Sequence, residues 1–209
     1  MLEPIPHTSW GLRIGDAVHN ARTALDYIAW RLAGGDLADI YTQFPIYLTS
    51  DKFESARWRL EKRKRIHADA IAEMAKLQPY TRPRANQSAL WLLQELDARD
   101  KHKLITITQQ VTRSSSVTVN DPVPVTIPYL ALDRIQHDTV VAEIGGAPNP
   151  DVNMQIEFSF EVLFERGFPT AGDEFAVSDS LLKVFDIVAQ VIRRFEWLLK
   201  RNPDWIPKP

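Results

Sequence analysis

Residues 12–33, LRIGDAVHNARTALDYIAWRLA, carry the pattern that most constrains how this chain folds. Apolar residues recur there at alternating intervals of four and three positions, which places them on one face of an α-helix. These residues are Ile14, Val18, Ala21, Leu25, Ile28 and Leu32. The opposite side includes Tyr27 and Trp30, which are too apolar for a face that meets only water. We therefore expect a helix that is contacted on two sides.

A second stripe with the same spacing predicts the last helix, over residues 178–201. Its apolar positions are Leu181, Phe185, Val188, Ile192, Phe195 and Leu199. Helices with matching stripes pack together well, so we expect the first and last helices to be neighbours. Two more helical regions are predicted between them. The first spans residues 50–77, as one helix or as two joined near His67, and the second spans residues 88–104.

From residue 105 to residue 168 the periodicity changes to two. Short β-branched runs alternate with turn residues, as in an antiparallel meander. The clearest strand is MQIEFSFEVLFE, where apolar and polar residues alternate and predict one buried face. The sequence thus predicts a single α+β domain over residues 1–209. It combines a helical part (12–104), an inserted antiparallel β-meander (105–168) and a C-terminal helix (178–201).

Composition restricts the chemistry available to this domain. The chain has no cysteine, which excludes disulfides, thiolate nucleophiles and cysteine-ligated metals. It has no glycine-rich phosphate-binding motif, so we expect no nucleotide cofactor and no other cofactor. The first residues do not resemble a signal peptide, and nowhere do about 18 apolar residues run together. We therefore expect a cytoplasmic protein that does not bind membranes.

Charge is unevenly distributed, although the formal net charge is only -2. Residues 57–84 hold nine Lys or Arg against three acids, and residues 133–179 hold ten acids against two Lys or Arg. Basic residues around an indole are one way to hold single-stranded nucleic acid. The candidate set is Arg57, Trp58, Arg59, Lys62, Arg63, Lys64 and Arg65. The alternatives, which we favour, are a solvated basic face and a tryptophan that packs on the bundle.

The polar side of the first helix offers another candidate site. His19, Arg22 and Asp26 are three or four positions apart, so their side chains are neighbours on the helix. In the region 88–104, Asp100 falls on the apolar face, and a carboxylate there needs a partner. We therefore expect Asp97 or Asp100 to face Arg22 or His19 across a contact between the two helices.

This cluster has two main interpretations, which the sequence leaves open. It is either a buried network that fixes helix register, or an open cleft in which a histidine acts as general acid or base and Arg22 holds an anion such as phosphate. The catalytic set would be His19, Arg22, Asp26, Asp100 and His102. A metal site would instead use Asp16, His19, Asp100 and His102. The chain lacks the common metal-binding motifs, so we expect no metal.

Several short blocks resemble an uncharacterised family of bacterial and phage-encoded proteins with the pattern G-D-x-x-H-N-x-R-x-A-L-D. The first block is GDAVHNARTALD, followed by FPI, LQPY and DKH in the first half of the chain. A more distant similarity is to HEPN-type helical domains, many of which are metal-independent RNases with an R-x(4–6)-H motif at a dimer interface. Here four residues lead from Arg22 to Tyr27, where members of the nearer family often have histidine.

The resemblance implies a HEPN-like module that binds RNA or a protein partner, with a role in phage–host conflict. The two apolar stripes and the aromatic residues expected on the surface favour a homodimer. The alternatives are a metal-independent RNase of HEPN type and a small metal-dependent hydrolase. An enzyme requires His19, Arg22 and Asp100 to converge on an open cleft. A binding module tolerates a closed network of the same residues.

Overall fold

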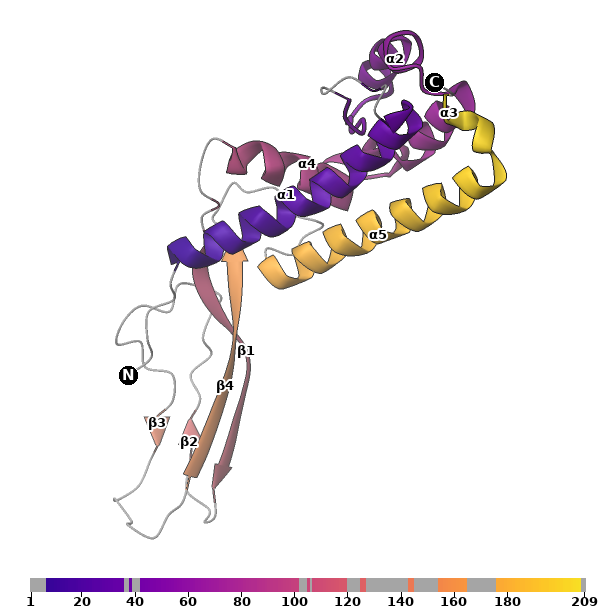
Figure 1. Ribbon diagram of the computed structural model, residues 1–209. Coiled ribbons are helices and arrows are strands. Elements are labelled where there is room, and N and C mark those ends of the chain that lie inside the picture. The colour runs from indigo at the N-terminus through magenta and orange to yellow at the C-terminus, as the bar shows by residue number, and fades with distance from the viewer. Residues whose placement is uncertain are drawn as a thin grey trace.

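The computed structural model shows a mostly helical protein with one long pair of strands (Figure 1). It describes residues 7–35, 38, 42–101, 105, 107–119, 125–126, 143–144, 154–164 and 176–207. The helices are α1 (His7–Leu32), α2 (Ser50–Trp58), α3 (Ala68–Leu77), α4 (Ala89–Asp100) and α5 (Val177–Arg201). The strands are β1 (Ile107–Val119), β2 (Val125–Thr126), β3 (Glu143–Ile144) and β4 (Met154–Phe164). A π-helical turn follows α2 at Arg59–Arg63, and short 3-10 turns lie at Pro79–Thr81, Ala85–Gln87 and Pro203–Trp205.

The first and last helices are neighbours, as predicted. α1 and α5 lie side by side and run in the same direction, and α4 also packs against both (Figure 1). All six apolar residues predicted for the inner face of α1 are buried. In α5 the predicted stripe is partly wrong, because Phe185 is exposed. The residues buried there are Val177, Ser180, Val184, Val188, Val191, Phe195 and Leu198.

An extended segment, residues 42–47, crosses the helices and supplies part of the core. The Phe44 ring meets Phe195 of α5 edge to face, with ring centroids 6.1 Å apart. The segment is extended but is not a strand, which agrees with a position next to proline. It ends where the Thr49 side chain accepts a hydrogen bond from the amide of Lys52 and so caps α2.

The helical region predicted over residues 50–77 is two helices. α2 continues into the π-helical turn, and Arg65 then has φ 56, a left-handed conformation that interrupts the helix. The chain resumes as α3 after His67, whose Nδ1 accepts a hydrogen bond from the amide of Asp69. Glu73 of α3 forms an ion pair with Arg194, which ties α3 to α5.

The strands differ from the predicted meander. β1 pairs with β4 in antiparallel register from Ile107–Phe164 to Val119–Met154, and β2 pairs with β3. A meander, in which each strand pairs with the next, is not shown among the described residues. The β1–β4 ladder projects from the end of the helical part where α5 begins, and Phe164 at its end is buried in the core (Figure 1). Alternation predicts which residues share a face but not which strands pair.

Candidate functional site

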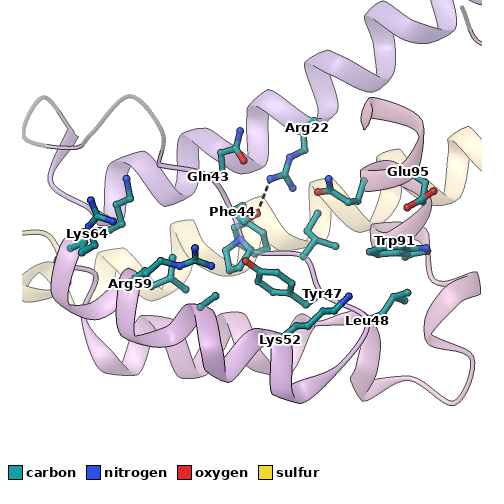
Figure 2. A pocket seen from close by; sticks show the side chains of 16 residues that line it. Arg22, Gln43, Phe44, Tyr47, Leu48, Lys52, Arg59, Lys64, Trp91 and Glu95 are labelled. Atoms are coloured by element: carbon teal, nitrogen blue, oxygen red, sulfur yellow. Dashed lines mark hydrogen bonds between the residues drawn. The ribbon is translucent and has the colours of Figure 1, made fainter. Parts of the chain in front are cut away.

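A pocket of about 620 Å³ lies between α1, the extended segment, α2 with its π-helical turn, and α4 (Figure 2). Its lining combines five cationic side chains with aromatic and amide groups. The cations are Arg22, Lys52, Arg59, Arg63 and Lys64. Glu95 is the single acidic residue among the lining residues. The pocket is therefore strongly basic, although the chain as a whole is slightly acidic.

Arg22 is the most deeply placed of these cations. Only 5% of the residue is exposed, and its guanidinium points from α1 into the pocket (Figure 2). Nη2 donates to the Phe44 carbonyl at 2.7 Å and pairs with Oδ1 of Asp26 at 2.9 Å. Nη1 is buried and has no hydrogen-bond partner among the described residues. An unsatisfied buried donor is costly, so this nitrogen calls for an acceptor other than the described residues.

Burial alters the acid–base behaviour of this pair. It lowers the pKa of Arg22, against the opposing effects of Asp26, Asp97 and Tyr47. It also raises the pKa of Asp26, against the opposing effects of Arg22 and of the Phe44 amide, which donates to Oδ1 of Asp26 at 2.8 Å. An arginine stays protonated near neutral pH even when its pKa is lowered. Arg22 thus brings a largely buried positive charge to the pocket.

The π-helical turn brings three other cations to the same wall of the pocket. The Lys64 amide donates to the Arg59 carbonyl at 3.0 Å, the five-residue step of a π-helix. This wider turn brings Arg59, Arg63 and Lys64 to the pocket together. Among the residues that the structure describes, no carboxylate lies within ion-pair distance of Lys52, Arg59 or Arg63. These charges are available to an anionic ligand.

The other end of the pocket is aromatic. Trp91 and Glu95 lie one turn apart on α4, opposite Arg59 and Lys64 (Figure 2). The Tyr47 ring lies between the two ends and packs edge to face on Phe53, with centroids 6.3 Å apart. The pocket therefore has a cationic end at Arg59 and Lys64 and an aromatic end at Trp91 and Glu95, toward which the Lys52 side chain extends (Figure 2).

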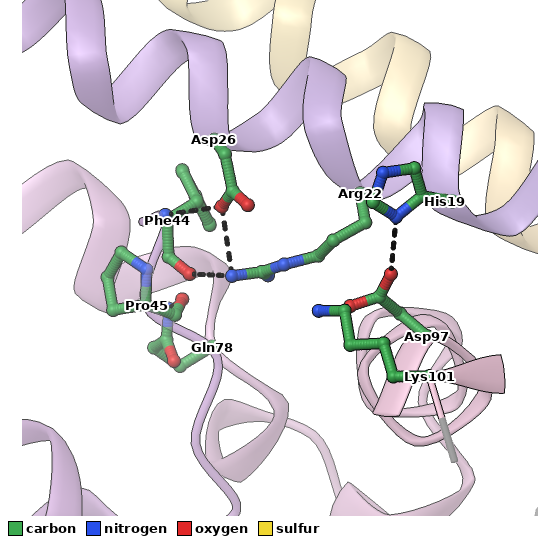
Figure 3. Close-up of polar contacts among 8 residues, drawn as sticks. All are labelled: His19, Arg22, Asp26, Phe44, Pro45, Gln78, Asp97 and Lys101. Atoms are coloured by element: carbon green, nitrogen blue, oxygen red, sulfur yellow. Dashed lines mark hydrogen bonds and ion pairs between the residues drawn. The ribbon is translucent and has the colours of Figure 1, made fainter. Parts of the chain in front are cut away.

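The predicted contact between the first and third helical regions is confirmed (Figure 3). His19 Nδ1 lies 3.1 Å from Oδ1 of Asp97, and Lys101 donates to Oδ2 of the same carboxylate at 2.7 Å. Asp97 is buried, while 58% of the His19 side chain is exposed. The hydrogen bond between His19 and Asp97 thus joins α1 to α4.

The candidate catalytic residues do not meet in one cleft. Arg22 lines the pocket, whereas His19, Asp26 and Asp100 do not. Asp26 is paired with Arg22, and Asp100 lies against Gly15 on α1. His102 lies outside the described residues. The described members of the set therefore form neither one open cleft nor one buried network: Arg22 pairs with Asp26, His19 pairs with Asp97, and 58% of the His19 side chain is exposed.

The seven candidate nucleic-acid residues separate into two groups. The residues on the pocket are Arg59, Arg63 and Lys64. Trp58 lies outside it and is 61% exposed, so the favoured packing of this tryptophan on the bundle is wrong. Arg57 pairs with Glu54 at 3.5 Å, and Lys62 lies 3.6 Å from Glu61. Arg65 is exposed and lies outside the pocket lining.

Sequence reasoning missed Gln78, which fixes the wall of the pocket. This side chain is completely buried, and its Nε2 donates to the carbonyls of Pro45 at 2.8 Å and Met74 at 3.2 Å. Its Oε1 accepts from the Tyr47 amide at 2.9 Å. Gln78 therefore joins the LQPY block to the FPI block. Its place in LQPY was the one available signal, because no periodicity marks a buried glutamine.

Neither a search for metal ligands and membrane spans nor a comparison with known proteins assigns a function to the pocket. Among the described residues, no three histidine or carboxylate side chains come together as metal ligands. None of the described helices combines the length and apolar character needed to span a bilayer. Comparison of the chain with protein-family models, with curated proteins and with solved structures finds no match. The similarity to the bacterial and phage family and to HEPN domains, with its implied role in phage–host conflict, stays a prediction.

Proposed function

We propose that this protein is a helical binding module that recognises the phosphate groups of RNA in the pocket between α1, α2 and α4. The observation that carries the proposal is the set of cations Lys52, Arg59 and Arg63, which line one pocket and have no carboxylate within ion-pair distance among the described residues. A phosphate group matches these charges, and a guanidinium binds phosphate more strongly than a neutral donor does. Arg22 adds charge at the same site.

RNA is favoured over a protein partner by an exposed tryptophan on α2, the helix that continues into the π-helical turn. Trp58, next to Arg59 in the sequence, exposes 61% of its surface on α2. An exposed indole beside cations is a stacking platform for an unpaired base. A binding role is favoured over cleavage because His19 and Asp100 lie outside the pocket lining. A metal-independent RNase and a metal-dependent hydrolase are therefore the alternatives that the test must separate.

The test measures the affinity of a fluorescein-labelled, single-stranded RNA of mixed sequence over a range of salt concentrations. The variant Arg59→Ala/Arg63→Ala removes two charges from the pocket. The variant Arg57→Ala/Lys62→Ala is its matched control, because it removes the same charge from the same stretch outside the pocket lining. We expect the pocket variant to bind at least about tenfold more weakly and its salt slope to fall by about 1.4. We expect the control to change affinity by less than about threefold.

An equal loss of RNA affinity in both variants would show that only the overall positive charge matters. That result would contradict a specific role for the pocket. The same samples are examined for cleavage with and without chelator. Cleavage that resists the chelator would establish the RNase alternative, and cleavage that the chelator abolishes would establish the metal-dependent one. Retention without cleavage is the expected result.

A homodimer is part of the proposal, and α5 is the surface that favours it. Leu182, Phe185 and Trp197 expose 66%, 38% and 52% of their surface along this helix. An antiparallel second copy of α5, centred between residues 189 and 190, brings Leu182 opposite Trp197 and Asp186 opposite Arg193. Both pairs then recur twice, as a two-fold interface requires.

A further inference from the structure

We propose that the pocket holds a single nucleotide of the RNA and that Glu95 selects guanine as its base. This inference rests on the proposed function, since it concerns the same pocket and its ligand. The phosphate occupies the cationic end near Arg22 and Arg59, and the base lies at the other end, on Trp91. The juxtaposition of five cations with one tryptophan and one carboxylate in the same pocket carries the proposal.

The size and polarity of the pocket match a nucleotide. A pocket of about 620 Å³ is within the usual range for small-molecule sites and accommodates one nucleotide unit. Its two ends have different chemistry, and a nucleotide has the same division between an anionic phosphate and a flat aromatic base. A simple inorganic anion would use the cationic end alone and leave the aromatic end empty.

Trp91 supplies the surface on which a base stacks. It is partly buried where it packs on the core, and it also lines the pocket. An indole that is held on one side has little freedom to lose when a base stacks on it. Tyr47 lies between Trp91 and Arg59, beside the path from base to phosphate (Figure 2).

Glu95 determines which base fits best. An ionised carboxylate only accepts hydrogen bonds, and it has two oxygens with which to do so. The Watson–Crick edge of guanine presents two adjacent donors, N1–H and the N2 amino group, so both oxygens are satisfied at once. Adenine and cytosine each present one amino donor beside an acceptor. Uracil presents one donor between two carbonyl oxygens, which the carboxylate repels.

The position of Glu95 supports this role. In the part of the chain that the structure describes, no cationic side chain lies within ion-pair distance of its carboxylate, although five cations line the same pocket. An acid that served only to neutralise this charge would be paired with one of them. Glu95 instead lies beside Trp91, opposite the cationic end (Figure 2).

The experiment compares short uridine RNAs that carry one central guanosine, inosine, adenosine or uridine. For the wild-type protein we expect guanosine to bind about tenfold more tightly than uridine, in the range of one bidentate base contact. Inosine lacks the N2 amino group and should fall between them. In Glu95→Gln we expect the preference for guanosine to disappear while the all-uridine RNA binds at least as well as before. Glu54→Gln, an exposed acid outside the pocket, is the control and should keep the preference.

The outcomes separate this inference from the function on which it rests. Equal affinity of the wild type for all four RNAs would overturn guanine selection, and so would a preference that survives in Glu95→Gln or that inosine retains in full. Any of these three results would leave the proposed function standing if the all-uridine RNA still binds and still loses affinity in Arg59→Ala/Arg63→Ala. Absence of binding to every RNA would overturn both. The inosine comparison uses the wild-type protein, so it holds even if a variant folds poorly.

Discussion

Gly15 of α1 lies directly against the carboxylate of Asp100 on α4, and a Cβ atom at residue 15 would overlap that carboxylate. The missing side chain lets the two helices approach closely at this point. About one turn further along α1 and one turn back along α4, His19 meets Asp97. The contact between α1 and α4 thus depends on a small residue followed by a hydrogen-bonded pair.

Replacing this glycine tests the contact directly. Gly→Ala inside a helix normally stabilises by about 1 kcal/mol, because alanine has the higher helix propensity. At Gly15 we expect the opposite sign, since the new methyl group displaces Asp100 and overpacking costs about 1–3 kcal/mol. Thermal and urea denaturation of Gly15→Ala measure the free energy of unfolding.

The second half of this test removes the Asp100 carboxylate that lies against Gly15. In an Asp100→Ala background the space beside residue 15 is larger, so Gly15→Ala should become neutral or stabilising by up to about 1 kcal/mol. A loss of stability that is the same with and without Asp100 would show that the carboxylate is not what excludes a side chain at this position.

Gln78 should be the most sensitive polar residue near the pocket. Gln78→Leu keeps most of the volume but leaves the Pro45 carbonyl and the Tyr47 amide without the partner that Gln78 provides. Because each unsatisfied buried group costs about 1–3 kcal/mol, we expect a loss of about 2–4 kcal/mol in the free energy of unfolding.

The matched control for this change is Gln87→Leu. Gln87 makes an exposed contact with Arg84, so its replacement should alter the free energy of unfolding by less than about 0.5 kcal/mol. Urea denaturation at one pH compares the two variants. Similar small effects in both would show that the Gln78 hydrogen bonds do not hold the extended segment in place.

Glu73 should make stability depend on pH in the acid range. Its hydrogen bonds with Lys76 and Arg194 lower the pKa of this carboxyl in the folded state. The unfolded chain therefore takes up the proton first as pH falls, so the stabilisation is present above the unfolded pKa of about 4.3 and is lost as pH falls through the lower folded value. Because Lys76 and Arg194 are largely exposed, solvent screening limits the gain to about 1 kcal/mol.

Glu73→Gln measures this contribution. The variant should be less stable than the wild type at pH 7, and the two stabilities should converge as the pH falls below about 4. High salt should reduce the difference at pH 7, because both partners are exposed and screened. A difference that stays constant from pH 7 to the acid range would assign the effect to packing instead of charge.

The sequence predicted the helical part well where one face of a helix is apolar and the other is polar. The stripe from Ile14 to Leu32 has one possible orientation, and it is buried as expected. α5 has apolar residues around more than half of its circumference, so two stripes can be drawn, and Phe185 was assigned to the wrong one. The pairing of β1 with β4 depends on contacts between distant segments that alternation does not encode.

The site was predictable only where its contacts lie within one helix. Arg22 and Asp26 are four positions apart on one helix, and their pairing follows from that spacing. Tyr47, Trp91 and Glu95 come together with Arg22 only when three separate segments fold against one another. Single-sequence periodicity therefore identified the deepest cation but not the pocket that it lines.

The proposed dimer makes its own prediction through Asp186 and Arg193. In the antiparallel arrangement each of these residues faces the other on the second copy, so reversing one charge places like charges together at two symmetric positions. Asp186→Arg and Arg193→Asp should each raise the dissociation constant by about tenfold or more. The double variant Asp186→Arg/Arg193→Asp restores opposite charges and should regain most of the affinity.

Light scattering after size exclusion measures the mass of each variant over a range of micromolar concentrations. Asp186 also accepts a hydrogen bond from Gln190 at 2.6 Å, and Asp186→Arg removes this bond. Thermal melting therefore checks that each variant stays folded. A wild type that stays monomeric, or single swaps that stay as dimeric as the wild type, would exclude this interface. A double variant that fails to regain dimer affinity, although both single variants remain folded, would show that Asp186 and Arg193 do not face each other. That result would assign the exposed Leu182 and Trp197 to a different contact.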